Sequence, residues 1–239
     1  MNFVFMASLQ SDMYRKPNTG MFDYILSNYN DNNIHIDYKS SFFVGDAAGR
    51  LKGWEYNKKA DFSCSDRKFA LNCKLNYYTP EEFFLDHNTC TKYYLLDLPK
   101  IINDNMNNTY PDKLLNIKNN NKQLILFIGF PGCGKSTLFY RYFEHKNYKR
   151  VNRDELKSMN KCEQYCLNYI KSGYSVVIDN TNPSIQSRRK FIDIGRQYKY
   201  QIIGIWFNID KNLCFHMNCI RHRDGHNIDK IPVMAYIKY

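Results

Sequence analysis

The sequence contains no apolar run of the about 18 residues that a membrane-spanning helix requires. Its first seven residues, MNFVFMA, also lack the basic start and the long apolar stretch of a secretory signal peptide. These absences argue against an integral membrane protein and against secretion. We therefore expect an intracellular protein that does not insert into a membrane.

Cysteine is present, but it lacks the spacing of a disulfide framework or of a tight metal site. The eight cysteines include no C-x-x-C pair. Free thiols in a reducing compartment are therefore expected. Two loose clusters leave a zinc site open as an alternative to ordinary core and surface thiols. One is Cys162 with Cys166, and the other is Cys214, His216 and Cys219.

Acidic residues are scarce relative to basic ones. Lysine and arginine together number 34, against 23 aspartates and glutamates, and the net charge is +11. Such an excess favours a polyanionic partner, either nucleic acid or an anionic surface. A general lysine bias is the alternative, because charge alone does not identify a partner. The hydrophobic content of 44% is enough for one large or two small packed domains.

The segment Gly129–Thr137 (GFPGCGKST) matches the pattern G-x-x-x-x-G-K-[ST] of phosphate-binding loops. It follows an apolar run at Gln123–Ile128, which predicts a buried strand, and it precedes helix-compatible residues. Loop N–H groups at the mouth of a helix bind a polyphosphate. We expect Lys135 to reach the β- and γ-phosphates of ATP and Ser136 to hold Mg²⁺. The expected nucleotide contacts are Gly129, Pro131, Gly132, Cys133, Gly134, Lys135, Ser136 and Thr137.

Strand and helix signals alternate from this loop onward. The expected strands are Gln123–Ile128, Lys149–Asn152, Ser175–Ile178 and Gln201–Phe207. The expected helices lie near Lys135–His145, Glu155–Ser172, Ile185–Gln197 and Leu213–Arg223. This alternation predicts an α/β fold with a parallel sheet and helices on its faces. Because the phosphate loop, Asp154 and Asp179 each follow a strand, we expect them to form one composite active site.

An asparagine-rich stretch divides the chain. Ile102–Asp112 and Asn119–Asn121 are poorly periodic and predict a linker. We therefore expect one domain at residues 1–98, a linker at 99–122 and a second domain, which carries the phosphate loop, at 123–239. The strands or buried pieces expected in the first domain are Phe3–Leu9, Ser41–Val44 and Phe69–Cys73.

Several further motifs accompany the phosphate loop in a fixed order. They are Tyr14–Met21 (YRKPNTGM), Val44–Arg50 (VGDAAGR), Asp61–Ala70 (DFSCSDRKFA), Tyr78–Phe84 (YTPEEFF), Val151–Asp154 (VNRD) and Ile178–Pro183 (IDNTNP). Together they resemble the bifunctional polynucleotide kinase 3′-phosphatases of eukaryotic DNA repair. The resemblance covers most of the chain, with the linker as the main exception.

The resemblance implies a partial haloacid-dehalogenase-like phosphatase domain followed by a phosphate-loop kinase domain. Lys16 matches the family's phosphatase lysine and Asp46 its metal-side carboxylate, while Asp61 and Asp66 lie in a matching block. The family's nucleophile is an aspartate in a D-x-D-G-T motif, and this sequence holds no such motif. We therefore expect no 3′-phosphatase activity, since none of these groups replaces the attacking carboxylate. Compared with the family, we expect the chain to be shortened at both ends.

In the kinase domain the resemblance implies that Asp154 is the general base that accepts the proton of the attacking hydroxyl. A helix N-cap is the alternative role for Asp154. Asp179 is expected near Mg²⁺, with a strand-terminal turn as its alternative. Arg221 matches an arginine of the family's lid better than Arg223 does, and a solvated basic face is the alternative. Other basic residues close to these strand ends are Lys157, Arg188 and Arg189.

The leading hypothesis is an ATP- and Mg²⁺-dependent kinase that phosphorylates 5′-hydroxyl ends of DNA, with RNA ends as a further candidate substrate. The expected partners are DNA 5′-hydroxyl and 3′-phosphate ends, and the expected location is the nucleus. We expect a monomer, and no scaffold-binding forkhead-associated domain is recognisable. A small-metabolite kinase is one alternative, but it does not explain the block from Tyr14 to Arg50. A catalytically inactive end-binding protein is another, but the intact phosphate loop and Asp154 argue against it.

Overall fold

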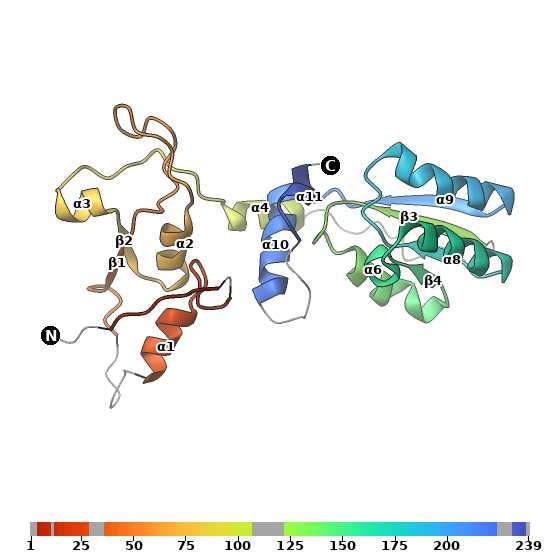
Figure 1. Cartoon of the computed structure of the whole chain (residues 1–239), viewed down its shortest axis with the longest axis horizontal. Helices are drawn as coiled ribbons and strands as arrows, with labels where there is room; N and C mark the ends of the chain where they lie inside the picture. Colours follow the sequence, from red (N-terminus) through yellow and green to blue (C-terminus); the bar gives the residue numbers. More distant parts are fainter. Residues whose placement is uncertain (1–3, 11, 29–35, 107–121, 224–230, 238–239) are drawn as a thin grey trace. The chain divides into compact units, whose positions relative to one another are not determined.

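The computed structural model describes residues 4–10, 12–28, 36–106, 122–223 and 231–237 (Figure 1). The chain forms two compact units, residues 1–96 and 97–239, and each is described by itself. Within the described ranges, no helix combines the length and the apolar character needed to cross a bilayer.

The second unit is built on a four-stranded parallel sheet. Its strands are β3 (Gln123–Ile128), β4 (Lys149–Val151), β5 (Val176–Ile178) and β6 (Gln201–Trp206), in the order β4-β5-β3-β6. All neighbours pair in parallel. The predicted parallel α/β sheet is therefore confirmed, and each predicted strand differs from the observed one by one residue at most.

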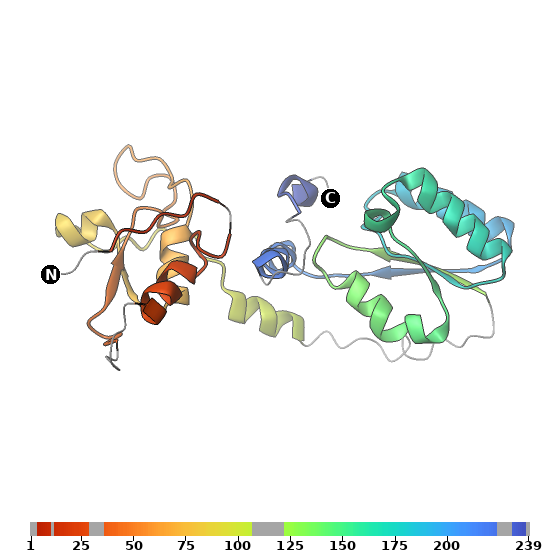
Figure 2. The same cartoon turned by 60° about the horizontal axis from the view of Figure 1, so that its bottom comes forward.

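Helices cover both faces of this sheet, as Figure 2 shows for α6 on one side and for α8 and α9 on the other. Alternate residues of β3 point to opposite faces. Ile125 and Phe127 join an apolar cluster with α6 residues and with Cys214, whereas Leu124 and Leu126 join one with α8 and α9 residues. The helices are α6 (Lys135–Tyr142), α7 (Arg153–Leu156), α8 (Met159–Lys171), α9 (Ile185–Gln197), α10 (Lys211–Arg223) and α11 (Met234–Ile237), with a 3-10 turn at Glu144–Lys146.

Local capping explains where these helices begin and end. The helix expected at Glu155–Ser172 is instead two helices, because Lys157 adopts a left-handed conformation with a φ of 62° and ends α7. Asp210 accepts hydrogen bonds from the N–H groups of Asn212 and Leu213, so α10 begins two residues earlier than expected. Side chains at helix starts satisfy N–H groups that lack a helical partner.

Helix α4 (Leu98–Met106) lies within the segment expected to be a linker. Asp97 accepts a hydrogen bond from the N–H of Lys100 with its side chain and one from Ile101 with its carbonyl. An N-cap aspartate with a proline in the first turn is a helix-start signal that outweighs the weak periodicity of the segment. α4 packs against α10. Most of the asparagine-rich stretch, residues 107–121, lies outside the described residues.

The first unit contains a two-stranded parallel sheet of β1 (Phe42–Val44) and β2 (Asn76–Tyr78), with helices α1 (Gly20–Asn28), α2 (Ser65–Asn72) and α3 (Pro80–Phe84). The strand expected at Ser41–Val44 is confirmed as β1. The expectation of a strand or buried piece at Phe3–Leu9 is wrong over the described residues, since Phe5 and Leu9 are 95% and 93% exposed.

In the stretch Phe69–Cys73, three residues are buried but Leu71 is exposed, and the stretch belongs mostly to helix α2 and not to a strand. The buried residues are Asp66, Phe69, Ala70 and Cys73. Their spacing of i, i+3, i+4 and i+7 is that of one helix face. The helical spacing of the buried residues therefore identifies a helix, although five consecutive residues are too few to show that spacing in the sequence.

Candidate active site

The phosphate loop connects β3 to α6 in the predicted strand–loop–helix arrangement. Lys135 is only 8% exposed, and its Nζ donates to the carbonyl oxygens of Gly129 at 3.0 Å and Phe130 at 2.6 Å. Gly134 begins α6 with a φ of 91°, a conformation that glycine adopts without steric cost. The ammonium group is thus held inside the loop that is expected to surround the phosphates.

Gly132 lies against the backbone of α10. It has a φ of 80°, and a Cβ at this position would lie 2.4 Å from the carbonyl oxygen of Cys214. Such a distance is far inside van der Waals contact, and a backbone atom of a packed helix cannot move away easily. The second glycine of the loop is therefore required both for its conformation and for the close approach of α10.

We expect Gly132→Ala to destabilise the protein more than Gly173→Ala. Gly173 has a similar φ of 74°, but a Cβ there meets nothing within 4 Å. Gly173→Ala should therefore cost only the left-handed conformation, about 1–2 kcal/mol, whereas Gly132→Ala adds the clash with α10. Thermal unfolding of the two variants measures the difference. Equal losses of stability would contradict the close approach of loop and helix.

Cys133 and Cys214 connect the loop to α10 through their side chains. The hydrogen bond from Cys214 lowers the pKa of the Cys133 thiol to about 7, and the adjacent Lys135 ammonium lowers it further against the opposing effect of burial. The same hydrogen bond raises the pKa of Cys214. The two thiols thus join the loop to α10, and Cys133 Sγ lies 3.5 Å from Lys135 Nζ.

The zinc sites left open as an alternative are not assembled among the described residues. Cys162 and Cys166 lie in the apolar cluster beneath α8, and Cys214 lies in the cluster on the other face. Among the described residues, no three His, Cys, Asp or Glu side chains are grouped as metal ligands. These cysteines pack as core residues.

Ser136 and Asp179 are brought together at the carboxyl edge of the sheet. Ser136 Oγ donates a hydrogen bond of 2.8 Å to Asp179 Oδ2. Asp179 follows β5 directly and is 2% exposed, and its Oδ1 has no hydrogen-bond partner within the described part of the chain. A hydroxyl beside a buried carboxylate with an unused oxygen fits the oxygen ligands that Mg²⁺ prefers. These two residues are therefore able to hold that ion.

Arg150, which the sequence analysis did not select, completes this pair. It lies on β4, and its Nε and Nη2 donate to Asp179 Oδ2 at 2.8 Å and 2.6 Å. Its Nη2 also donates to Ser136 Oγ at 3.1 Å. The signal in the sequence is a charged residue inside a short strand that is otherwise expected to be buried.

Asp154 is exposed near the start of α7, the helix that follows β4. Its carboxylate forms no hydrogen bond or ion pair with the described residues. The N-cap of α7 is Asn152, whose Oδ1 accepts from the N–H groups of Asp154 at 2.8 Å and Glu155 at 3.3 Å. The alternative N-cap role for Asp154 is therefore wrong. Asn152 Nδ2 also donates to the Asp179 carbonyl at 2.7 Å, which connects the ends of β4 and β5.

The arginines beyond β5 have different positions. Arg188 Nη1 donates to the carbonyl oxygens of Asn182 and Pro183 at 2.7 Å and 2.9 Å, so it stabilises the loop after β5. Arg189 is exposed. Lys157, at the left-handed end of α7, is also exposed.

Arg221 lies on α10, the helix that contacts the phosphate loop. Its Nη2 donates to Asn218 Oδ1 at 3.2 Å, and its Nε is buried without a partner among the described groups. Asn218 is fully buried and donates to the Ile231 carbonyl. Arg221 is thus partly held by the protein and is not part of a fully solvated basic face. The side chain of Arg223 lies outside the described residues.

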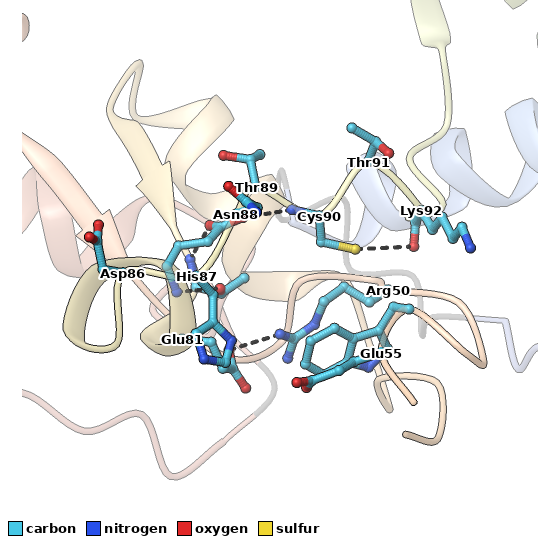
Figure 3. A pocket seen from close by; sticks show the side chains of 13 residues that line it. Arg50, Glu55, Glu81, Asp86, His87, Asn88, Thr89, Cys90, Thr91 and Lys92 are labelled. Carbon is cyan, nitrogen blue, oxygen red and sulfur yellow. Dashed lines mark hydrogen bonds and ion pairs between the residues drawn. The ribbon is translucent and has the colours of Figure 1, made fainter. Parts of the chain in front are cut away.

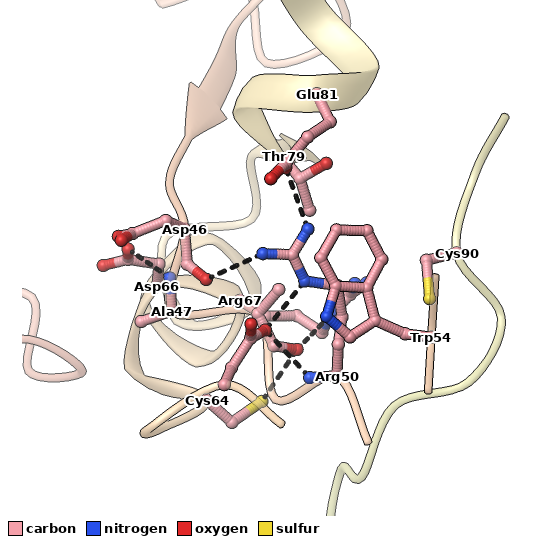
Figure 4. Close-up of polar contacts among 12 residues, drawn as sticks. Asp46, Ala47, Arg50, Trp54, Cys64, Asp66, Arg67, Thr79, Glu81 and Cys90 are labelled. Atoms are coloured by element: carbon pink, nitrogen blue, oxygen red, sulfur yellow. Dashed lines mark hydrogen bonds and ion pairs between the residues drawn. The ribbon is translucent and has the colours of Figure 1, made fainter. Parts of the chain in front are cut away.

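In the first unit, Lys16 and Asp66 form a close ion pair. Lys16 Nζ lies 2.6 Å from Asp66 Oδ1, and the N–H of Ala47 donates to Asp66 Oδ2 at 3.0 Å. Asp66 is buried, whereas Asp46, next to Ala47 at the end of β1, is exposed (Figure 4). Three of the four residues expected at the phosphatase site therefore lie around the end of β1.

Asp61, the fourth, belongs to a polar network around Arg50 that also reaches the end of β1. Its Oδ2 accepts hydrogen bonds of 2.9 Å from both the N–H and the Nε of buried Arg50. Arg50 Nη1 donates to Glu81, and its Nη2 donates to the Asp46 carbonyl oxygen at 3.4 Å (Figure 4). Burial lowers the pKa of Arg50, but the bonds to Asp61 and Glu81 outweigh that effect and raise it. Asp61 therefore neutralises a buried arginine in this structure.

A cavity of about 520 Å³ opens beside this network (Figure 3). Its lining includes Arg50, Trp54, Glu81, His87 and Lys92. Trp54 stacks on the Arg50 guanidinium at 3.8 Å from the ring centre. The expected phosphatase residues Lys16, Asp46 and Asp66 do not contribute to the described lining of this cavity, although its lining residue Arg50 donates to the Asp46 carbonyl oxygen.

Comparison with known protein families defines the class of each unit. Residues 1–84 match the family model described as polynucleotide kinase 3 phosphatase, and residues 124–236 match one described as an AAA domain. The expected fold class is confirmed: a haloacid-dehalogenase-like phosphatase unit precedes a phosphate-loop kinase unit with a parallel sheet.

Individual relatives agree with these matches. The chain is 35% identical, over 98% of its length, to the bifunctional polynucleotide phosphatase/kinase of Schizosaccharomyces pombe. It is 36% identical, over 99% of its length, to an Acanthamoeba polyphaga mimivirus protein described as a putative bifunctional polynucleotide phosphatase/kinase. Over 34% of its length it is 42% identical to the polynucleotide 3′-phosphatase ZDP of Arabidopsis thaliana, and it covers 10% of that protein.

The chain is accordingly a homologue of the bifunctional polynucleotide phosphatase/kinases, as its motifs predicted. It spans 54% of the length of the S. pombe relative and 60% of that of the mimivirus relative.

Proposed function

We propose that the chain is an ATP-dependent kinase that transfers a phosphoryl group to 5′-hydroxyl ends of DNA. One observation carries this proposal. At a single sheet edge, a phosphate loop with a buried lysine and a Ser136–Asp179 pair accompanies an exposed carboxylate, Asp154, that has no partner among the described residues. A carboxylate that neither caps a helix nor forms an ion pair with the described residues, and that lies at the sheet edge where nucleotides bind, is suited to accept a proton.

The residues would divide the reaction among them. Lys135 neutralises charge on the β- and γ-phosphates, and the N–H groups of Gly132–Lys135 surround them. Asp154 accepts the proton of the attacking 5′-hydroxyl as the new P–O bond forms. Arg221 would approach the transferring phosphoryl group from α10. Phosphoryl transfer depends mostly on such positioning and charge neutralisation.

Ser136 and Asp179 are the residues that would hold Mg²⁺, since the hydroxyl and the free Oδ1 offer oxygen ligands. When bound, the ion would reduce the negative charge that the attacking hydroxyl must approach. The alternative role of Asp179, a simple strand-terminal turn, does not require a buried and unpartnered carboxylate oxygen.

Three features support a polynucleotide as the acceptor. Residues 1–84 match the polynucleotide kinase 3 phosphatase family, the most similar relatives reported above are polynucleotide phosphatase/kinases, and the net charge is +11. A small-metabolite kinase would require none of them. A nuclear location, a monomeric state and the use of RNA ends follow from the same resemblance and belong to this proposal.

Transfer of label from γ-labelled ATP tests the acceptor. We expect label on a 5′-hydroxyl DNA oligonucleotide with MgCl₂, and none with EDTA or with a 5′-phosphorylated oligonucleotide. Nucleosides and sugars at the same concentration serve as matched acceptors, and an RNA oligonucleotide measures the DNA preference. Label on nucleosides alone would identify a small-metabolite kinase. Binding of DNA ends without any transfer would identify an inactive end-binding protein.

The phosphatase unit should release no phosphate from a 3′-phosphorylated oligonucleotide when the 239-residue chain is assayed. Its sequence holds no D-x-D-G-T aspartate to form an aspartyl-phosphate. Lys16 is paired with Asp66, and Asp46 lies where a metal-side carboxylate is expected. Phosphate release with MgCl₂ measures the activity, and Asp46→Ala provides the background. Turnover above that background would mean that another carboxylate acts as the nucleophile.

A further inference from the structure

The Arg150 guanidinium contacts both groups that are expected to hold Mg²⁺, the Ser136 hydroxyl and the Asp179 carboxylate. Its Nη2 is 2.6 Å from Asp179 Oδ2 and 3.1 Å from Ser136 Oγ, and its Nε is 2.8 Å from Asp179 Oδ2. Each of the two groups therefore already interacts with one positive charge of the protein. This arrangement involves no ligand and no group outside the second unit.

The contacts saturate one oxygen of Asp179 and leave the other unused. Oδ2 accepts from Ser136 Oγ and from two nitrogens of Arg150, whereas buried Oδ1 has no partner among the described groups. A buried carboxylate requires a compensating charge, and Arg150 supplies it. A divalent ion at Ser136 and Asp179 would supply it as well. Two cations within a few ångströms in a partly buried site repel each other strongly.

We propose that Arg150 is a built-in cation that holds the Ser136–Asp179 pair in the absence of metal and that Mg²⁺ displaces from it. The inference rests on the proposed Mg²⁺ site of the kinase. Arg150 thereby acts as a positioning residue: it keeps hydroxyl and carboxylate together before the metal arrives, and it sets the Mg²⁺ concentration at which the site fills.

The structure also provides a position for the displaced guanidinium. Arg150 Nη1 already donates to Tyr140 OH at 3.0 Å and to Glu155 Oε1, and Glu155 is 60% exposed. Glu155 lies on α7 next to Asp154. Release from Asp179 leaves Arg150 paired with Glu155 at the sheet edge, so loading of the metal site is coupled to the helix that carries Asp154.

The test is the MgCl₂ dependence of thermal unfolding at a fixed concentration of ADP. A ligand that binds only the folded state raises the melting temperature, so the MgCl₂ concentration at half of the rise reports filling of the site. We expect Arg150→Gln to lower this midpoint on the order of tenfold, because the competing charge is gone. Arg150→Lys keeps a charge but loses the paired N–H groups, and we expect an intermediate midpoint.

Arg141→Gln is the matched control, since Arg141 is exposed on α6 and its removal changes the net charge equally. It should leave the midpoint unchanged. An unchanged or higher midpoint in Arg150→Gln overturns the proposal, because Arg150 would then support the metal or ignore it. If Arg150→Gln folds only in MgCl₂, the metal replaces the missing charge and the proposal holds. If it folds at no MgCl₂ concentration, a wild-type midpoint in Arg150→Lys overturns it.

The outcome is separable from the proposed kinase function. Wild-type protein that shows no rise in melting temperature with ADP and MgCl₂ has no magnesium-nucleotide site, which contradicts the kinase itself. A normal rise in wild type together with equal midpoints in all variants contradicts only the role of Arg150.

Discussion

Lys135→Ala abolishes the transfer of label from ATP to 5′-hydroxyl DNA, while the second unit remains folded. The lysine ammonium is the charge that meets the β- and γ-phosphates as the bond breaks. Loss of one such group costs at least roughly 10²–10³-fold in rate. In the structure its contacts are to carbonyl oxygens of its own loop, which water is able to replace. Labelling assays and circular dichroism measure the two expectations.

Lys135→Met and Lys161→Ala separate charge from other effects. Lys135 is buried, so methionine keeps much of its volume without the ammonium group and should be equally inactive. Lys161 is exposed on α8, and its loss should leave activity unchanged. Labelling by Lys135→Ala at more than a few hundredths of the wild-type rate would show that this loop is not catalytic.

Asp154→Asn retains nucleotide binding and loses turnover on the order of 10²–10⁴-fold. The amide has nearly the same shape but is a poor proton acceptor. Because Asn152 caps α7 and the Asp154 side chain is exposed, the substitution should not lower the melting temperature. Single-turnover labelling and ADP binding, measured on the same preparation, distinguish loss of chemistry from loss of nucleotide.

Two variants provide the comparison for Asp154. Asp193→Asn makes the same change on the exposed surface of α9 and should be neutral. Asn152→Ala removes the N-cap and should cost about 1 kcal/mol of stability. If Asp154→Asn loses stability as Asn152→Ala does and keeps its turnover, Asp154 is a structural residue and another group accepts the proton.

The sheet of the second unit was predictable because three of its four strands, β3, β5 and β6, are largely apolar runs between turn signals. The site edge followed from the same pattern, since the phosphate loop and Asp179 each come directly after a strand, and Ser136 of α6 indeed meets Asp179. Patterning could not predict the partner of a long polar side chain. Arg150 reaches Asp179 from a neighbouring strand, 29 residues earlier in the chain, and only the strand order reveals that contact.

The first unit was predicted less well for a physical reason. Its elements are short, and an apolar run of about five residues fits either a strand or a helix face. Phe69–Cys73 shows this ambiguity, since tertiary packing selects the helix. Asp61 illustrates the same limit for polar residues. Its position in a family block did not reveal that its carboxylate pairs with the buried guanidinium of Arg50.

The contact between Gly132 and α10 also determines where sequence variation is tolerated. The helix meets the loop through the carbonyl oxygen of Cys214, which every amino acid possesses. Related proteins can therefore change residue 214 without disturbing this contact, provided that α10 stays at the same distance from the phosphate loop. The demand falls entirely on position 132, where any side chain would push the helix away. An alignment would thus record a constraint shared by two elements as one invariant glycine.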